Sequence, residues 1–261
     1  MEVFTTLALP SDEWFPRGLT IGSFDGVHLG HQMILSRLRQ RVGPEGGVAV
    51  ISFSNHPSEL FRGKSVPLLS SKEQKIKLLE EQGVDVLYLL AFDQDLAGQS
   101  YHAFLHEVKE VYPFTHLIHG KGDAFGRNRE GDETHILAMA QKEDFSAEYV
   151  DKFYPEGKPL SSGVIRELIA EARFSEAAFL LGRPYSLMAP LEINVQDPHE
   201  AQMATGMLCL PPDGSYACEI FWNGKHLPTQ AIVFQAAQRV VLRFPHALYP
   251  ERGRIAELVF H

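Results

Sequence analysis

The sequence predicts an α/β fold, in which a parallel sheet with helices on its faces is followed by a smaller antiparallel β domain. Two observations support this class. Up to about residue 185, short apolar runs alternate with segments whose apolar residues recur at the helical period. Beyond that point, strand-like runs follow one another and are separated by turn signals. We place the boundary so that the expected domains are 1–187 and 188–261.

The apolar runs of the first domain predict its strands, and the amphipathic segments between them predict its helices. The expected strands are 18–22, 48–53, 84–92 and 116–119, and the expected helices are 32–41, 72–82, 101–111, 134–141 and 164–172. Ligands of such sheets bind beyond the carboxyl ends of the strands. The turns that directly follow the strands are therefore the places where functional residues are expected.

The second domain is expected to be antiparallel because its strand-like runs are joined by short turns. These runs are 208–210, 216–222, 231–234, 240–244 and 255–260. Asn223-Gly224 lies between two of them, and this dipeptide predicts a β-hairpin with a two-residue turn.

The charge balance argues against nucleic acid and anionic membranes as partners. Lys and Arg number 24 against 33 Asp and Glu, which gives a net charge of −9, whereas both partners need a basic face. The N-terminus does not read as a signal peptide, and no apolar stretch is long enough to span a bilayer. The two cysteines, Cys209 and Cys218, are expected to be buried thiols. We expect a soluble, cytoplasmic protein.

The segment GSFDGVHLGH, residues 22–31, follows the first expected strand and precedes the expected helix 32–41. A glycine-containing turn of this kind presents backbone N–H groups and the positive end of a helix to an anion. His28 and His31 could donate hydrogen bonds to phosphate oxygens, and Gly30 would let a phosphate approach the backbone. The alternatives are two surface histidines or a metal pair, for which no third ligand is evident nearby.

A second candidate is the segment SSGVIR, residues 161–166, at the start of the expected helix 164–172. Ser161 and Ser162 could bind a phosphate at this helix start, with Arg166 one turn further as a forked cation. The alternative is simpler: a serine caps the helix, and Arg166 is solvated.

Two further segments follow expected strands. SFSNHP, residues 52–57, places His56 before a proline, where it either shapes a turn or faces the same crevice. GKGDAFGRNREGD, residues 120–132, is a glycine-rich basic loop that fits neither the dinucleotide-binding spacing nor a P-loop. His102 and His106 form a possible metal pair on a helix, but they lack the glutamate of an H-E-x-x-H motif, and we interpret them as solvated.

Taken in order, these segments resemble the bacterial bifunctional riboflavin kinase/FAD synthetase family. The resemblance rests on TIGSFDGVHLGHQ, SFSNHP, HGKGDAFGRNREGD, SSGVIREL and LLGRPY, and it covers residues 18–185. It implies a Rossmann-like nucleotidylyltransferase domain that transfers AMP from ATP to FMN and yields FAD and pyrophosphate. ATP with Mg²⁺ and FMN are the small molecules implied, and no metal ligands on the protein are assigned.

The resemblance also implies which residues form the site. The catalytic residues would be His28, His31 and Arg166, and ATP would be bound by Gly22, Phe24, Asp25, Gly30, His31, Ser161, Ser162 and Arg166. The flavin would be bound by Asn55, His56, Lys121, Asp123, Phe125, Arg127 and Arg129.

The sequence departs from the family's pattern in three places. Gly163 stands where the family has a threonine, which removes a hydroxyl from the phosphate site. Gly122 and Asp123 stand where an acid or amide and a phenylalanine are expected. The C-terminal segment lacks the kinase's G-x-P-T-A-N segment and has no carboxylate in QRVVL, residues 238–242, although LPPDGSYACEIFWNGK and FPHALYPERGRI faintly resemble parts of its barrel.

These departures predict a shortened riboflavin-kinase-like barrel that has lost its kinase activity. They also leave two alternatives to FAD synthesis. One is a nucleotidylyltransferase for another phosphorylated acceptor, and the other is a non-catalytic regulator that binds flavin or nucleotide.

Overall fold

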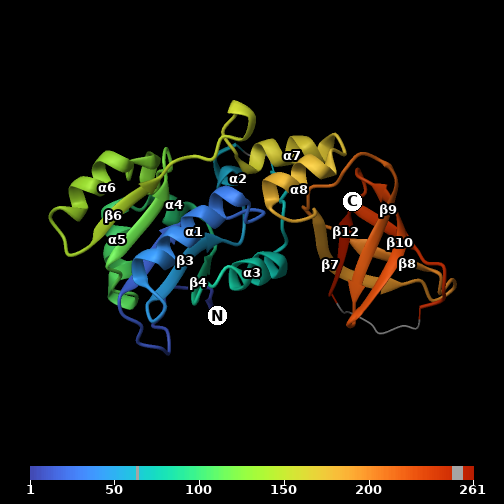
Figure 1. Ribbon diagram of the computed structural model, residues 1–261, viewed down its shortest axis with the longest axis horizontal. Helices are drawn as coiled ribbons and strands as arrows, with labels where there is room; N and C mark the ends of the chain where they lie inside the picture. The colour runs from blue at the N-terminus through green and yellow to red at the C-terminus, as the bar shows by residue number, and fades with distance from the viewer. Residues whose placement is uncertain (63–64, 249–254) are drawn as a thin grey trace. The chain divides into compact units, whose positions relative to one another are not determined.

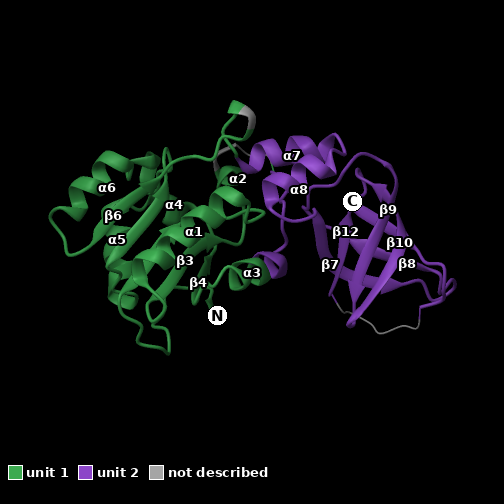
Figure 2. Ribbon diagram, viewed as in Figure 1, with its two compact units in different colours: residues 1–65, 76–160 green, residues 66–75, 161–261 purple. Residues whose placement is uncertain are grey.

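The computed structural model describes residues 1–62, 65–248 and 255–261, and the chain divides into two compact units. Unit 1 comprises Met1–Ser65 and Ile76–Leu160, and unit 2 comprises Val66–Lys75 and Ser161–His261 (Figure 2). The units group 66–75 and 161–187 with the C-terminal part, so they do not coincide with the expected domains 1–187 and 188–261. That division stays a prediction.

Unit 1 is built on a parallel six-stranded sheet with the strand order β1-β4-β3-β2-β5-β6 (Figure 1). The strands are β1 (Glu2–Phe4), β2 (Arg17–Ile21), β3 (Gly47–Phe53), β4 (Val86–Leu90), β5 (His116–Gly120) and β6 (Ser146–Val150). The predicted Rossmann-like parallel sheet is confirmed. β2 lies beside both β3 and β5, so the strand order reverses at β2.

Helices cover both faces of this sheet, as the side chains of β3 show. Val48 and Val50 pack with α1 (Leu29–Val42) and α3 (Lys72–Glu81), whereas Ala49 and Ile51 pack with α5 (Tyr101–Val111) and α6 (Glu133–Ala140). Successive side chains of a strand point to opposite faces, so a strand covered on both sides reads as one apolar run. The remaining helical segments of unit 1 are α2 (Pro57–Arg62), α4 (Gln94–Gly98), η1 (Arg127–Arg129) and η2 (Pro155–Gly157).

The first helix begins three residues earlier than expected. The sequence predicted a helix over 32–41, but α1 starts at Leu29 with His28 as its N-cap. Gly30 and His31 therefore belong to the first turn of the helix instead of the preceding loop. In contrast, α5 has the bounds predicted for it, with Ser100 capping its start through a hydrogen bond from Ala103 N.

Unit 2 contains two helices and a closed antiparallel barrel with the strand order β10-β11-β8-β7-β12-β9. The helices are α7 (Ser162–Ala170) and α8 (Phe174–Leu181), and the strands are β7 (Ser186–Ile193), β8 (Glu200–Ala204), β9 (Gly214–Trp222), β10 (Lys225–Phe234), β11 (Arg239–Arg243) and β12 (Ile255–Phe260). The barrel confirms the expected antiparallel β domain.

The predicted hairpin is confirmed in the barrel. Trp222 pairs with Lys225, and Asn223 and Gly224 both have positive φ angles, 51° and 72°. These angles are those of the tight hairpin turn that Asn-Gly favours. The predicted strand 208–210 is wrong, since Leu208 makes only an isolated bridge to Leu68. In the segment FPHALYPERGRI, residues 249–254 lie outside the described residues.

The two cysteines are buried and unlinked, as predicted. Within the described part of the chain, the helices are all too short or too polar to cross a membrane.

Candidate active site

The turn after β2 holds a strained backbone. Phe24 and Val27 have φ angles of 47° and 40°, a region that β-branched and bulky residues rarely adopt. Both side chains are 1% exposed and belong to the core on the α1 side of the sheet. Burial of these side chains therefore holds the turn in a backbone conformation that is unfavourable for its residues. Backbone strain of this kind is typical of functional sites.

The two histidines of the turn form a stacked pair at the start of α1. Their ring centroids lie 3.7 Å apart with an angle of 11° between the planes, and Phe24 lies 4.7 Å from the ring of His31. His28 is 6% exposed, and its Nδ1 accepts the backbone N–H of His31 at 3.4 Å. This hydrogen bond caps the helix and, in a neutral ring, leaves the proton of His28 on Nε2.

Gly30 is needed for a reason that the sequence did not reveal. A Cβ atom at this position would lie 3.2 Å from Cε1 and 3.3 Å from Nδ1 of His28. These contacts are tighter than ordinary van der Waals distances. A side chain at residue 30 would therefore press on the capping imidazole, whatever ligand approaches the turn.

A cavity of about 710 Å³ opens beyond the carboxyl ends of β2 and β5, within unit 1. This volume lies within the usual range for small-molecule sites. Of the residues predicted from the family resemblance, it is lined by Gly22, Phe24, His31, His56, Asp123, Phe125 and Arg129. Segments from three different turns thus meet in one place, as the parallel sheet predicted.

Aromatic side chains give the cavity apolar walls. Phe53 and Phe92 meet edge to face with their centroids 5.1 Å apart, and Phe104 and Phe125 meet in the same way at 6.3 Å. Flat rings of this kind favour a planar aromatic ligand, because edge and face contacts are both available to it.

The glycine-rich loop is folded against α5. A Cβ at Gly126 would lie 2.5 Å from the backbone N of Tyr101, so only glycine allows this approach. Arg129 has a positive φ of 61°, and its Nη2 donates to the carbonyl oxygen of Gly122 at 3.2 Å. The loop therefore brings the guanidinium of Arg129 to the cavity.

His119 is one of the polar residues of the cavity that were not predicted from the sequence. It lies in β5 and is 2% exposed, and burial lowers its pKa to about 4, with a hydrogen bond to the backbone of Ile21 acting in the opposite direction. Its Nε2 has no hydrogen-bond partner among the described residues. Asp123 lines the same cavity, and partial desolvation raises the pKa of its carboxyl group although the residue as a whole is exposed. The sequence signal that could have identified His119 was a histidine inside the apolar run HLIH.

Other predicted residues are not part of the cavity lining described by the structure: Asp25, His28, Gly30, Asn55, Lys121 and Arg127. Asn55 is bound on both amide atoms by the backbone of Phe92, at 2.8 and 2.9 Å. Lys121 pairs with Asp151 at 2.7 Å, and Arg127 lies 3.9 Å from Glu130. Their assigned roles stay predictions.

The second predicted phosphate-binding segment belongs to unit 2. Ser161 is the N-cap of α7 and accepts a hydrogen bond from Val164 N at 3.4 Å, so the expected serine cap is present, whereas phosphate binding by Ser161 and Ser162 stays a prediction. Arg166 donates from Nε to the carbonyl oxygen of Pro67 at 2.6 Å. A Cβ at Gly163 would meet only Ser161 Oγ, at 3.5 Å. The structure therefore has room for the threonine that the family has at this position.

Fold and cavity together define a Rossmann-like α/β domain with a cavity at the reversal of strand order. The chain belongs to the FAD synthetase family, whose sequence model matches residues 12–164, more than half of its length. The family predicted from the ordered motifs is thus confirmed.

Among similar proteins, the bifunctional riboflavin kinase/FMN adenylyltransferase of Listeria monocytogenes is 32% identical over 183 residues, which cover 68% of this chain and 58% of that protein. The protein of the same description from Haemophilus influenzae is 35% identical over 172 residues, 65% of this chain and 56% of that protein. The chain thus spans less than two thirds of the length of these relatives.

A solved structure described as a macrolide-efflux protein from Streptococcus pneumoniae has a similar fold. The TM-score is 0.80 at 19% identity, and the match covers 97% of this chain and 86% of that one. At this identity the likeness concerns the fold alone.

The lowered pKa of His119 predicts a pH-dependent stability. In the unfolded chain the imidazole takes up a proton near pH 6.5, whereas the folded protein resists this down to about pH 4. The stabilisation is complete above pH 6.5 and is lost as the pH falls towards 4. At pH 4.5 this costs about 2–3 kcal/mol relative to pH 7.5.

The measurement is the free energy of unfolding at both pH values for the wild type and for His119→Asn. The variant should lose less stability on acidification than the wild type, by about that amount. An equal loss in both proteins would show that His119 titrates normally in the folded state.

Proposed function

We propose that the chain is an FMN adenylyltransferase that transfers AMP from ATP to FMN and releases pyrophosphate. The observation that carries this proposal is that a single cavity combines aromatic walls with the histidine-bearing start of α1. The first feature suits a flavin ring system, and the second suits a phosphate chain. Membership of the FAD synthetase family supports the same reaction.

The flavin ring would occupy the apolar part of the cavity, between Phe53, Phe92 and Phe125. Arg129 is the cavity's guanidinium, held by its hydrogen bond to Gly122, and it would pair with the FMN phosphate. That phosphate carries close to two negative charges near neutral pH. It can therefore act as a nucleophile without first losing a proton.

The reaction needs no nucleophile from the enzyme. An oxygen of the FMN phosphate attacks the α-phosphorus of ATP, a new P–O bond forms, and the bond from that phosphorus to the bridging oxygen breaks. The electron pair leaves with pyrophosphate. His31, in the first turn of α1, would donate a hydrogen bond where this negative charge grows, and His28 would hold His31 in place through the stacked rings.

ATP would enter as its Mg²⁺ complex, and the ion would be held largely by phosphate oxygens and water. Asp25 is 1% exposed in the turn after β2 and is proposed to orient that turn. Ser161, Ser162 and Arg166 are proposed to bind the β- and γ-phosphates, as the family resemblance implies. We also propose that the protein acts in the cytoplasm.

The barrel of unit 2 is proposed to lack riboflavin kinase activity, because the chain has no G-x-P-T-A-N segment and β11 carries no carboxylate. The second candidate function is adenylylation of a different phosphorylated acceptor. It is favoured by Asp123, a carboxyl group in the cavity at a position where the family has phenylalanine.

Product analysis tests the proposal and its alternative. The pure protein is incubated with Mg-ATP and either FMN or riboflavin, and the flavins are separated by chromatography. We expect FAD from FMN and no FMN from riboflavin. Absence of FAD would contradict the proposed function, and formation of FMN from riboflavin would contradict the loss of kinase activity.

Replacing His31 by alanine should lower the turnover number far more than it raises the KM for ATP. A donor that acts mainly on the charge of the transition state is worth about 10²–10³ in rate. His135→Ala is the matched control, since His135 is an exposed histidine that pairs with Asp132. Near-normal turnover of the His31 variant would favour the surface-histidine interpretation.

The two arginines of the glycine-rich loop should differ in their effect. Arg129→Ala removes a cation that lines the cavity and should raise the KM for FMN about tenfold or more, the effect of losing a charged hydrogen bond. Arg127→Ala should change it less than about twofold, because Arg127 is exposed and faces Glu130, so the flavin-binding role expected of Arg127 from the sequence is not part of this proposal. Steady-state kinetics at saturating ATP measure both values. Equal effects would place the FMN phosphate elsewhere.

A further inference from the structure

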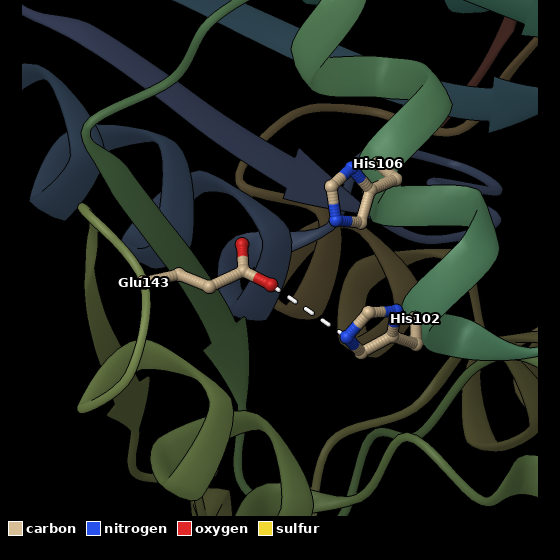
Figure 3. Close-up of side chains that lie close together, drawn as sticks. All are labelled: His102, His106 and Glu143. Atoms are coloured by element: carbon tan, nitrogen blue, oxygen red, sulfur yellow. Dashed lines mark ion pairs between the residues drawn. The ribbon is translucent and has the colours of Figure 1, made fainter.

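We propose that His102, His106 and Glu143 form a binding site for a divalent transition metal, with zinc as the best match. One ligand atom from each residue can be chosen so that all three lie within 4.8 Å of one another. Figure 3 shows the two imidazoles projecting from the same side of α5, with the carboxylate of Glu143 facing them. The site lies wholly in unit 1, and none of its residues lines the cavity described above.

The two histidines are placed by the helix itself. They are four residues apart on α5, so their side chains emerge one above the other on one face. Their ring centroids are 5.3 Å apart. A pair of imidazoles with this spacing on a helix commonly provides two of the protein ligands of a zinc site. The third ligand must then come from elsewhere in the fold.

Glu143 supplies that third ligand from the segment between α6 and β6. Its backbone is fixed on both sides, because its N–H donates to the carbonyl oxygen of Met139 at 3.0 Å and its own carbonyl oxygen accepts from Phe145 N at 2.9 Å. The side chain is only 20% exposed, and Oε1 lies 3.7 Å from Nε2 of His102. The two histidines were interpreted as solvated because they lack the glutamate of an H-E-x-x-H motif, whereas the fold brings a carboxylate to them from a distant part of the chain.

Lys109 orients this carboxylate. Its Nζ donates to the other oxygen, Oε2, at 2.9 Å and lies over the ring of Phe145 at 4.6 Å from its centroid. The carboxylate is therefore held by one oxygen while the second points to the histidines. A partner that fixes a ligand in this way acts as an outer-shell group of a metal site.

The donor set selects the metal. Two imidazole nitrogens and one carboxylate oxygen suit zinc and its neighbours in the transition series, whereas magnesium and calcium prefer oxygen ligands alone. Donors around a tetrahedral zinc ion lie about 3.3 Å apart, so the present separations of up to 4.8 Å must close by up to about 1.5 Å. His102 has a 58% exposed side chain, and His106 is also exposed, so both rings can rotate. Water would complete the coordination.

The test is a titration of zinc chloride into the untagged protein at pH 7.5, followed by calorimetry. We expect a single site with one zinc per chain, lost or weakened at least tenfold in His102→Ala, His106→Ala and Glu143→Gln. His135→Ala serves as the control and should bind zinc like the wild type. Far-UV circular dichroism without metal confirms that each variant is folded.

A second measurement locates the metal independently of affinity. Cobalt(II) added to the wild type should give visible absorption bands of a low-coordinate site, and these should vanish in the His102→Ala, His106→Ala double variant. Failure of the wild type to bind zinc stoichiometrically would overturn the proposal. So would zinc or cobalt binding that the double variant retains unchanged, since the metal would then lie at other histidines.

Discussion

The reversal of strand order at β2 is the constraint on which the rest of unit 1 depends. β3 and β4 extend the sheet on one side of β2, and β5 and β6 extend it on the other. The segments that leave β2 and β5 must therefore diverge, and a crevice opens between them at the carboxyl ends of the strands. The histidine turn follows β2, the glycine-rich loop follows β5, and the cavity lies where the two separate.

The packing of the core keeps the site in a shape that local preferences alone would not produce. Phe24 and Val27 hold unfavourable positive φ angles because their side chains are buried on the α1 face of the sheet. The resulting turn stacks His31 on His28, the residue that caps α1. Two imidazoles and a helix start are thus fixed in the free protein. Ligand binding therefore does not lose conformational entropy by ordering them.

The sequence predicted the parts of the fold whose burial pattern is simple. β3 was recognised because both of its faces are covered, and α5 because it has a clear apolar face. β6 was missed because SAEYV is mostly half-exposed at the edge of the sheet. Within the cavity, the residues of the turns were foreseen from motifs. His119 and the α4 residue Leu96 were not foreseen, because only the folded sheet brings them to the cavity. In the same way, only the fold brings Glu143 beside the two histidines of α5.

In the proposed reaction the α-phosphate of ATP, and no other, becomes bonded to the FMN phosphate. The fate of radioactive phosphorus tests this most directly: FMN is incubated with the protein and ATP labelled at either the α- or the γ-position. The proposed reaction puts the α-label in FAD and the γ-label in pyrophosphate. Transfer of the γ-label to a flavin, or an α-label that stays in ATP while FMN remains unchanged, would contradict it.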